Sequence, residues 1–297
     1  MTFVPDRPST RVPRTEPLKQ LLAGKGLTLK KRWGQHFCLD RNLIEFIVRT
    51  ADVEPRDVVL EIGPGLGHLT RVLAESSARV VAVEIDHGLA ALLRERISDL
   101  DNVDLIEADA LGKGEVLNPL VQEALRRVLA EEREGDLLVV SNLPYAVACT
   151  VILALLESGL PIVQMVLMIQ KEVAERLAAA PGDPAYGLTS VLAAAKAHVH
   201  LRRRVPPEVF WPRPRVPSEI VVITPREGSL EGAAYERLKG VAKAVFMHRR
   251  KTVTASLRLL GEAGKPLQKR FEVSGLPPAL RVDELGLDAL SRLAGIP

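Results

Sequence analysis

The sequence contains little cysteine, and this scarcity excludes several classes of protein. Only Cys38 and Cys149 occur among the 297 residues, which rules out a disulfide framework and indicates a reducing compartment. No combination of cysteine and histidine has the spacing of a zinc site. His198 and His200 lie beside an arginine run without acidic or thiol partners nearby, so we predict no metal site.

Long uninterrupted apolar segments are also absent. The N-terminus lacks the apolar core of a signal peptide. The most apolar region, residues 146–169, is interrupted by Glu157, Ser158, Gly159 and Pro161 and is therefore not expected to span a membrane. These absences predict a soluble, cytoplasmic protein.

The charge is nearly balanced, with 40 basic and 37 acidic residues and a net charge of +3. The basic residues nevertheless gather in three clusters, at 30–32, 202–204 and 249–251. One such cluster is more often an ordinary solvated face, but three together favour a polyanionic partner.

The length suits one large α/β domain and a smaller module. Short β-branched runs alternate with helical stretches, and the runs cover residues 57–62, 78–85, 103–108, 136–141 and 163–169. Continuous apolar strands that alternate with helices predict a parallel sheet with both faces covered, which is a doubly wound α/β domain.

The domain boundaries follow from shifts in composition. Residues 1–17 are rich in Pro, Thr and Arg and are expected to be a disordered tail. The α/β domain is predicted over 18–226, because the β pattern stops after Pro225, and a helical domain over 227–297. Within the first domain, residues 112–135 are predicted to form a charged surface helix without a functional role.

A glycine-rich loop, EIGPGLGHLT at 61–70, follows the first strand and opens a helix. Gly63, Gly65 and Gly67 allow a sharp turn and a close approach of the backbone to a ligand. The third glycine comes one residue too early for the dinucleotide fingerprint, so pyrophosphate binding is not the leading interpretation.

Two acids at the ends of the next strands strengthen the case for a nucleoside. Glu84 could accept hydrogen bonds from a ribose diol, and Asp109 from an adenine amino group. Either acid alone could equally be a helix N-cap. Together with the loop they indicate an adenosine site without a phosphate cradle. S-adenosylmethionine fits, because a cationic methyl donor tolerates acids that would repel a pyrophosphate.

The fourth strand ends in Asn142-Leu143-Pro144-Tyr145. The Asn142 side-chain oxygen and a main-chain carbonyl beside Pro144 could hold both N–H groups of a nucleobase amine and turn its lone pair toward a methyl group. Tyr145 offers a stacking face for a flipped base, and Phe210 is a candidate for the opposite face, although a core role suits Phe210 as well. The motif has no titratable general base, so we predict catalysis by positioning.

At these residues the sequence resembles the ribosomal RNA adenine dimethyltransferases, and most closely the enzymes that act on the small subunit. The matching stretches run in order from about residue 30 to residue 290, and NLPY together with QKEVAERL is highly specific. They are WGQHF (33–37), EIGPGLGHLT (61–70), VEID (83–86), Asp109, NLPY (142–145), LMIQKEVAERL (167–177), VFWPRPRVPSEIVV (209–222), FMHRRKT (246–252) and RVDEL (281–285).

The resemblance implies a Rossmann-like, class I S-adenosylmethionine-dependent methyltransferase domain followed by a small helical RNA-binding domain. It implies dimethylation of two adjacent adenosines in a hairpin near the 3′ end of small-subunit rRNA, as a step in small-subunit biogenesis. The small-subunit precursor is the expected partner of a monomeric enzyme.

The site residues that we expect fall into three groups. The cofactor would be lined by Gln35, His36, Cys38, Gly63, Gly65, Glu84, Asp109 and Asn142. The adenine would be framed by Asn142, Leu143, Pro144, Tyr145 and Phe210. RNA phosphates would contact Lys31, Arg32, Arg249, Arg250 and Lys251.

Two alternatives stay open. Resistance methylases of the large-subunit RNA share a similar Asn-x-Pro-aromatic motif, although RRKT and QKEVAERL favour the small-subunit class. A non-catalytic RNA-binding assembly factor is the second alternative, and the intact Glu84, Asp109 and NLPY argue against it.

Overall fold

A computed structural model describes residues 18–30 and 34–296 of the chain. The predicted tail over 1–17 and the predicted RNA contacts Lys31 and Arg32 therefore lie outside the described residues. Within the described ranges, no helix has both the length and the apolar character needed to cross a bilayer.

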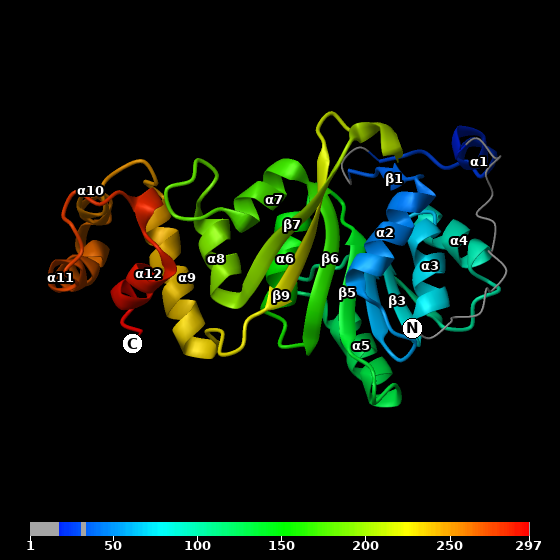
Figure 1. The fold of residues 1–297 in the computed structure, drawn as a ribbon, viewed down its shortest axis with the longest axis horizontal. Coiled ribbons are helices and arrows are strands. Elements are labelled where there is room, and N and C mark those ends of the chain that lie inside the picture. The colour runs from blue at the N-terminus through cyan, green and yellow to red at the C-terminus, as the bar shows by residue number, and fades with distance from the viewer. Residues whose placement is uncertain (1–17, 31–33, 297) are drawn as a thin grey trace, which may run out of the picture.

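Seven strands form one sheet at the centre of the molecule, in the order β4-β3-β2-β5-β6-β9-β7 (Figure 1). The strands from β2 to β6 run parallel, and β9 runs antiparallel to both of its neighbours. The doubly wound α/β prediction is thus confirmed. The strand bounds are β2 Val58–Ile62, β3 Arg79–Glu84, β4 Val103–Glu107, β5 Leu137–Asn142, β6 Ile162–Gln170, β7 Ala197–Val205 and β9 Ser218–Pro225.

Helices cover both faces of this sheet, because successive side chains of each central strand point to opposite faces and nearly all are apolar. One face packs against α2 and α3, and the other against α5, α6 and α7. The helices of this part are α1 Leu18–Gly24, α2 Arg41–Ala51, α3 His68–Ser76, α4 His87–Arg96, α5 Pro119–Glu131, α6 Ala148–Leu156, α7 Lys171–Ala178 and α8 Leu188–Lys196.

Local sequence signals set the helix ends. The Asp40 carboxylate accepts a hydrogen bond from Leu43 N at 3.1 Å and so caps α2. The helix predicted over 112–135 is wrong at its start. Asn118 caps α5 through a hydrogen bond from Leu120 N, and Glu115 has a positive φ, so the chain before Pro119 is a loop.

The C-terminal helices lie together at one end of the molecule (Figure 1). They are α9 Gly232–Phe246, α10 Val253–Leu259, α11 Lys265–Val273 and α12 Leu287–Leu293, with short 3₁₀ turns at Gly261–Gly264 and Val282–Glu284. Their buried residues, such as Leu238 and Leu290, form one apolar cluster with Val191 and Leu192 of α8. We call this cluster the junction core, because it contains residues from both sides of the predicted boundary at 226/227.

A small two-stranded sheet joins distant parts of the chain. In it β1 (Phe37–Cys38) pairs antiparallel with β8 (Phe210–Trp211), which follows a 3₁₀ turn at Pro207–Val209. Phe37 lies opposite Trp211, and Cys38 lies opposite Phe210. The N-terminal segment is thereby attached to the proline-rich loop.

The strands β2 and β5 part near their carboxyl ends. Their ladder pairs extend only to Leu60 opposite Val139. Beyond that point the Ser141 hydroxyl accepts a hydrogen bond from Ile62 N at 2.8 Å and replaces the missing ladder bond. Because β2 and β5 are where the strand order reverses, their carboxyl ends border the crevice in which open α/β sheets bind ligands.

We predict that Ser141→Ala destabilises the protein by about 1–3 kcal/mol, because the substitution leaves the buried Ile62 N–H without an acceptor. Urea unfolding of both proteins measures the difference. Ser98→Ala is the control, since Ser98 is exposed and its change should stay within about 0.5 kcal/mol. Equal effects of the two substitutions would contradict the structural role of Ser141.

Candidate active site

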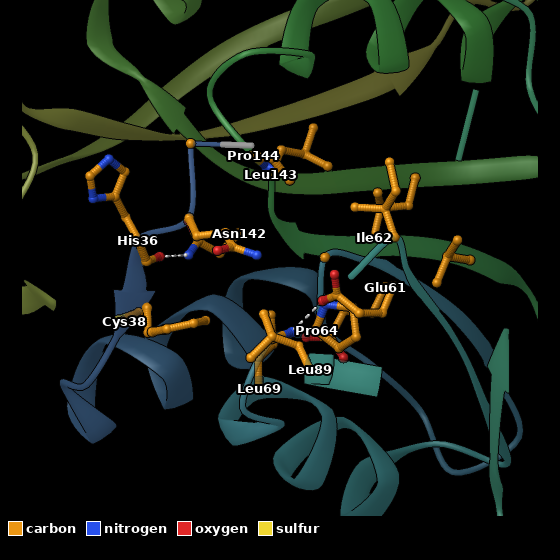
Figure 2. A pocket seen from close by; sticks show the side chains of 18 of the residues that line it. His36, Cys38, Glu61, Ile62, Pro64, Leu69, Leu89, Asn142, Leu143 and Pro144 are labelled. Carbon is orange, nitrogen blue, oxygen red and sulfur yellow. Dashed lines mark hydrogen bonds between the residues drawn. The ribbon is translucent and has the colours of Figure 1, made fainter. Parts of the chain in front are cut away.

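A cavity of about 220 Å³ lies at the carboxyl edge of the sheet (Figure 2). It is lined by the loop after β2, the ends of β3, β4 and β5, and the segment that contains β1. Every residue predicted to line the cofactor borders this cavity: Gln35, His36, Cys38, Gly63, Gly65, Glu84, Asp109 and Asn142. Leu143, Pro144 and Tyr145 border it too, so the predicted cofactor residues and most of the predicted adenine residues line one cavity.

The glycine loop packs closely against both the predicted adenine residues and the segment that contains β1. Gly63 has a φ of 74°, and a Cβ atom on it would lie 3.1 Å from Pro144 Cγ. Gly65 has a φ of 54°, and a Cβ there would lie 2.7 Å from the Phe37 ring. Both positions therefore require glycine for conformation and for space.

Glu84 is buried, and backbone N–H groups hold its carboxylate in place. Gly65 N donates to one oxygen at 3.1 Å, and Asp86 N donates to the other at 2.9 Å. Each oxygen keeps acceptor capacity for a diol. Burial raises the pKa of Glu84. The N-cap of α4 is Asp86 rather than Glu84, so the capping alternative does not hold for Glu84.

Asp109 is exposed at the rim of the cavity. Its side chain accepts a hydrogen bond from Leu111 N at 3.0 Å, which fixes one oxygen in a local turn. It does not cap α5, because Asn118 does. The second carboxylate oxygen remains available to a ligand in the cavity.

Glu61 is a cavity residue that the sequence reasoning missed, although it begins the quoted glycine motif. Its side chain is 2% exposed, and its Oε2 has no hydrogen-bond partner among the described residues. Burial, together with the nearby Glu84 carboxylate, raises the pKa of Glu61 to about 8. The carboxyl is therefore protonated at pH 7 in the ligand-free cavity, and a cationic ligand would stabilise its ionised form.

These side chains fit S-adenosylmethionine. Glu84 offers acceptors for a ribose, Asp109 offers one for an adenine amine, and Glu61 is a buried acid suited to a positively charged group. The glycine turn brings backbone groups close to the cavity, and the part of its lining that the structure describes contains no Lys or Arg for a pyrophosphate.

The Asn142 side chain has a defined orientation. Its Nδ2 donates to the His36 carbonyl oxygen at 2.9 Å, shown as a dashed line in Figure 2. A carbonyl can only accept, so the nitrogen must face His36 and Oδ1 is the remaining acceptor. His36 is held in turn, since its Nδ1 donates to the Pro212 carbonyl oxygen at 2.6 Å.

Contacts on two sides fix the Tyr145 ring. Its hydroxyl shares a hydrogen bond with Ser218 at the start of β9, and its ring centroid lies 5.1 Å from that of His36. Burial raises the pKa of the Tyr145 hydroxyl, so it stays neutral at physiological pH. The peptide before Leu143 is pinned as well, because Leu143 N donates to Met168 O at 3.1 Å.

Phe210 occupies a different place from the rest of the motif. It is 4% exposed, packs in the apolar cluster under α2 and does not border the cavity. The prediction that it frames the adenine therefore has no support in this geometry, and the core role that the sequence left open describes its position.

The three residues of the basic cluster at 249–251 differ in their contacts and exposure. Arg249 donates from its guanidinium to the backbone carbonyls of Asp183 and Pro184, which ties the turn after α9 to the loop before α8. Arg250 and Lys251 are exposed. The exposed pair, rather than Arg249, is free to meet phosphates.

Known proteins resemble this chain over most of its length. A family model described as ribosomal RNA adenine dimethylase matches residues 26–283. The ribosomal RNA small subunit methyltransferase A of Streptococcus mutans is 36% identical over 283 residues, which cover 93% of this chain and 94% of that protein.

Two solved structures are similar as well. The 23S rRNA methyltransferase ErmE is 28% identical with a TM-score of 0.62, over 87% of this chain and 98% of that one. A dimethyladenosine transferase from Plasmodium falciparum is 23% identical with a TM-score of 0.69, over 86% and 98% of the two chains, and supports the fold.

We predict that Glu61→Gln removes a pH dependence of stability. The folded pKa of about 8 lies above the unfolded value of 4.5, so the contribution of Glu61 is fully present below pH 4.5 and is lost as pH rises through about 8. Relative to wild type, the variant should gain stability over this window, at up to about 1.4 kcal/mol per pH unit.

Urea unfolding of the ligand-free protein at pH 5 and pH 8.5 measures this gain. The exposed Glu134→Gln is the matched control and should show no change with pH. A constant stability difference between Glu61→Gln and wild type would show that Glu61 is already ionised in the folded protein.

Proposed function

Because the chain belongs to the ribosomal RNA adenine dimethylase family, we propose that it dimethylates two adjacent adenosines in a hairpin near the 3′ end of small-subunit rRNA. S-adenosylmethionine is the methyl donor. The observation that carries the proposal is that one cavity is lined both by acids suited to a sulfonium nucleoside and by the oriented Asn142 amide. The reaction is a step in the biogenesis of the small ribosomal subunit.

The choice of the small subunit is supported by the degree of similarity. The relative from Streptococcus mutans, whose name specifies the small subunit, is 36% identical, whereas the large-subunit enzyme ErmE is 28% identical. The large-subunit alternative is therefore the weaker one.

The target amine must be made nucleophilic, because its lone pair is delocalised into the adenine ring. Asn142 Oδ1 and the Leu143 carbonyl oxygen accept its two N–H groups and turn the lone pair toward the cofactor. The hydrogen bond from Asn142 Nδ2 to the His36 carbonyl oxygen fixes the orientation of the amide before the base binds. Such positioning is worth several kcal/mol of barrier. S-adenosylmethionine supplies an electrophilic methyl group, and the proton of the amine leaves to water.

Tyr145 stabilises the flipped adenine. Stacking contributes about 1–3 kcal/mol per base, which offsets much of the cost of extracting it from the helix. Because Ser218 and His36 hold the ring, little side-chain freedom is lost when the base arrives. In this proposal Phe210 acts from the core, by pairing with Cys38 and so supporting the segment that orients Asn142.

The cofactor contacts follow from the cavity. Glu84 holds the ribose diol, Asp109 holds the adenine amine, and Glu61 faces the cationic end of the donor. The rest of the proposed cofactor wall is Gln35, His36, Cys38, Gly63 and Gly65.

Two finer points complete the proposal. The helical part over 227–297 binds RNA, with Arg250 and Lys251 as exposed phosphate contacts. The enzyme acts as a monomer on a precursor of the small subunit in the cytoplasm, since one chain supplies the whole set of groups that the reaction needs.

Mass spectrometry of rRNA digests from cells with and without the gene tests the function. We expect dimethyladenosine to disappear from the small-subunit rRNA of the deletion strain and to return when the gene is restored. Primer extension on both rRNAs locates the modification. A change confined to large-subunit rRNA would overturn the proposal in favour of the resistance-type alternative.

We predict that Asn142→Ala lowers methyl transfer by at least about a hundredfold, while RNA binding stays within a few fold, because the substitution removes an acceptor and not a phosphate contact. Asn142→Asp should fail as well, since a carboxylate cannot donate to the His36 carbonyl. Single-turnover transfer and equilibrium RNA binding separate the two effects. Unchanged transfer by Asn142→Ala would refute the positioning mechanism.

A further inference from the structure

The outer strand of the sheet, β7, ends in three exposed arginines, Arg202, Arg203 and Arg204. None of the three borders the cavity of the candidate active site. Arg202 and Arg203 have no acidic side chain within 4.0 Å in the described part of the chain, whereas Arg213 on the following loop is paired with Glu208. Two adjacent unpaired guanidinium groups at one strand end are thus open to an anionic partner.

Arg204 differs from its two neighbours. It lies opposite Glu219 of β9 in the strand register. Glu219 is buried, and the charge of Arg204 offsets part of the rise that burial causes in its pKa. Arg204 therefore stabilises a carboxylate of the sheet.

The arginines lie on the same edge of the sheet as the candidate active site. Since β7 and β6 are both antiparallel to β9, β7 runs in the same direction as β6, and its end is at the carboxyl edge. The register aligns Asn142 with Met168, Met168 with Ile220, and Ile220 with Arg203. Three strand spacings separate Arg203 from Asn142, so their backbones are about 14 Å apart.

The Arg202 and Arg203 side chains are both exposed beside an irregularity in the strand. The register shifts between Leu201 and Arg203, which makes Arg202 the extra residue of a bulge. Bulges bend a strand and redirect side chains, and they are frequent beside active sites. The Arg203 guanidinium lies 4.9 Å from the centroid of the Phe46 ring on α2, and this stacking holds it on the α2 face.

Protection of a sheet edge can account for charge on β7 but not for its position. Charged residues and bulges on an outer strand prevent pairing with other chains, and this role does not fix where along the strand the charges lie. In β7 the arginines gather at the carboxyl end alone, and the preceding residues from Ala197 to Leu201 contain no Lys or Arg. The positive charge of β7 is therefore concentrated at the edge of the sheet that carries the candidate active site.

We propose that Arg202 and Arg203 bind phosphates of the substrate RNA on the flank of the flipped adenine. This inference rests on the proposed function, because it takes the RNA as the occupant of the carboxyl edge. The planar guanidinium fork matches a phosphate through two parallel hydrogen bonds. An RNA strand that delivers its base to Asn142 crosses this edge, and phosphates about 14 Å from the base meet the two arginines.

The test uses the full-length enzyme with Arg202 and Arg203 both replaced by glutamine (R202Q/R203Q). Its substrates are small-subunit particles from the deletion strain. We expect KM for the particle to rise at least about fivefold, and the slope of log affinity against log salt to fall by about one per lost contact. The kcat and the dissociation constant of S-adenosylmethionine should stay at wild-type values, because neither arginine borders the cavity.

R126Q/R133Q is the matched control. Arg126 and Arg133 are exposed on α5 and on the turn that leads into β5, so Arg133 lies at the opposite, amino edge of the sheet. The control removes the same charge and should leave KM and the salt slope unchanged. Arg203→Lys keeps the positive charge but loses the planar fork, so its salt slope should stay at the wild-type value while part of the affinity is lost, which separates the charge of the contact from its two-bond geometry.

Three results would overturn the inference. Equal effects of R202Q/R203Q and R126Q/R133Q would show a response to net charge alone. Wild-type KM and salt slope in R202Q/R203Q would show a solvated edge. Absence of methyl transfer by the wild-type enzyme in the same assay would refute the proposed function and the inference with it, whereas normal wild-type transfer with an unaffected R202Q/R203Q refutes the inference alone.

Discussion

The parting of β2 and β5 is the constraint on which the site depends. The crevice lies outside the carboxyl ends of these two strands, where the strand order reverses, and strands that part there without compensation would leave a buried amide without an acceptor. Ser141 provides that acceptor for Ile62 N. The same separation lets the glycine loop turn against Pro144 and sets Asn142 at the mouth of the cavity, where the His36 carbonyl fixes its amide.

Much of the fold and of the candidate site could be predicted from the sequence, because the sequence patterns that determine them are local. The buried strands are continuous β-branched runs, and their predicted bounds agree with the observed ones to within about one residue. In a parallel sheet the residues after each strand meet at one edge, so Glu84, Asp109 and Asn142 could be placed together before any contact was known. The Asp40 cap of α2 follows from equally local chemistry.

The rest depends on pairings between segments far apart in the chain. Phe210 is buried because β8 pairs with β1, more than 170 residues earlier, and no pattern in the sequence predicts that pairing. Arg249 belongs to a run of like charges, yet two carbonyls of a distant loop engage its guanidinium. Glu61 begins a recognised motif, but its unpaired oxygen is a property of the assembled cavity. The sequence gives the charge and polarity of each side chain, whereas only the fold determines which polar groups already have a hydrogen-bond partner.

The junction core has a consequence for how this architecture can vary. Since α8 and the C-terminal helices bury one shared apolar surface, neither is a module that a gene fusion could exchange alone. Loss of the chain beyond residue 226 would expose the apolar surface around Val191 and Leu192, and the truncated protein would tend to self-associate through it. Sequence change in the terminal helices is therefore least constrained at their outer faces, whereas their inner faces must stay complementary to α8.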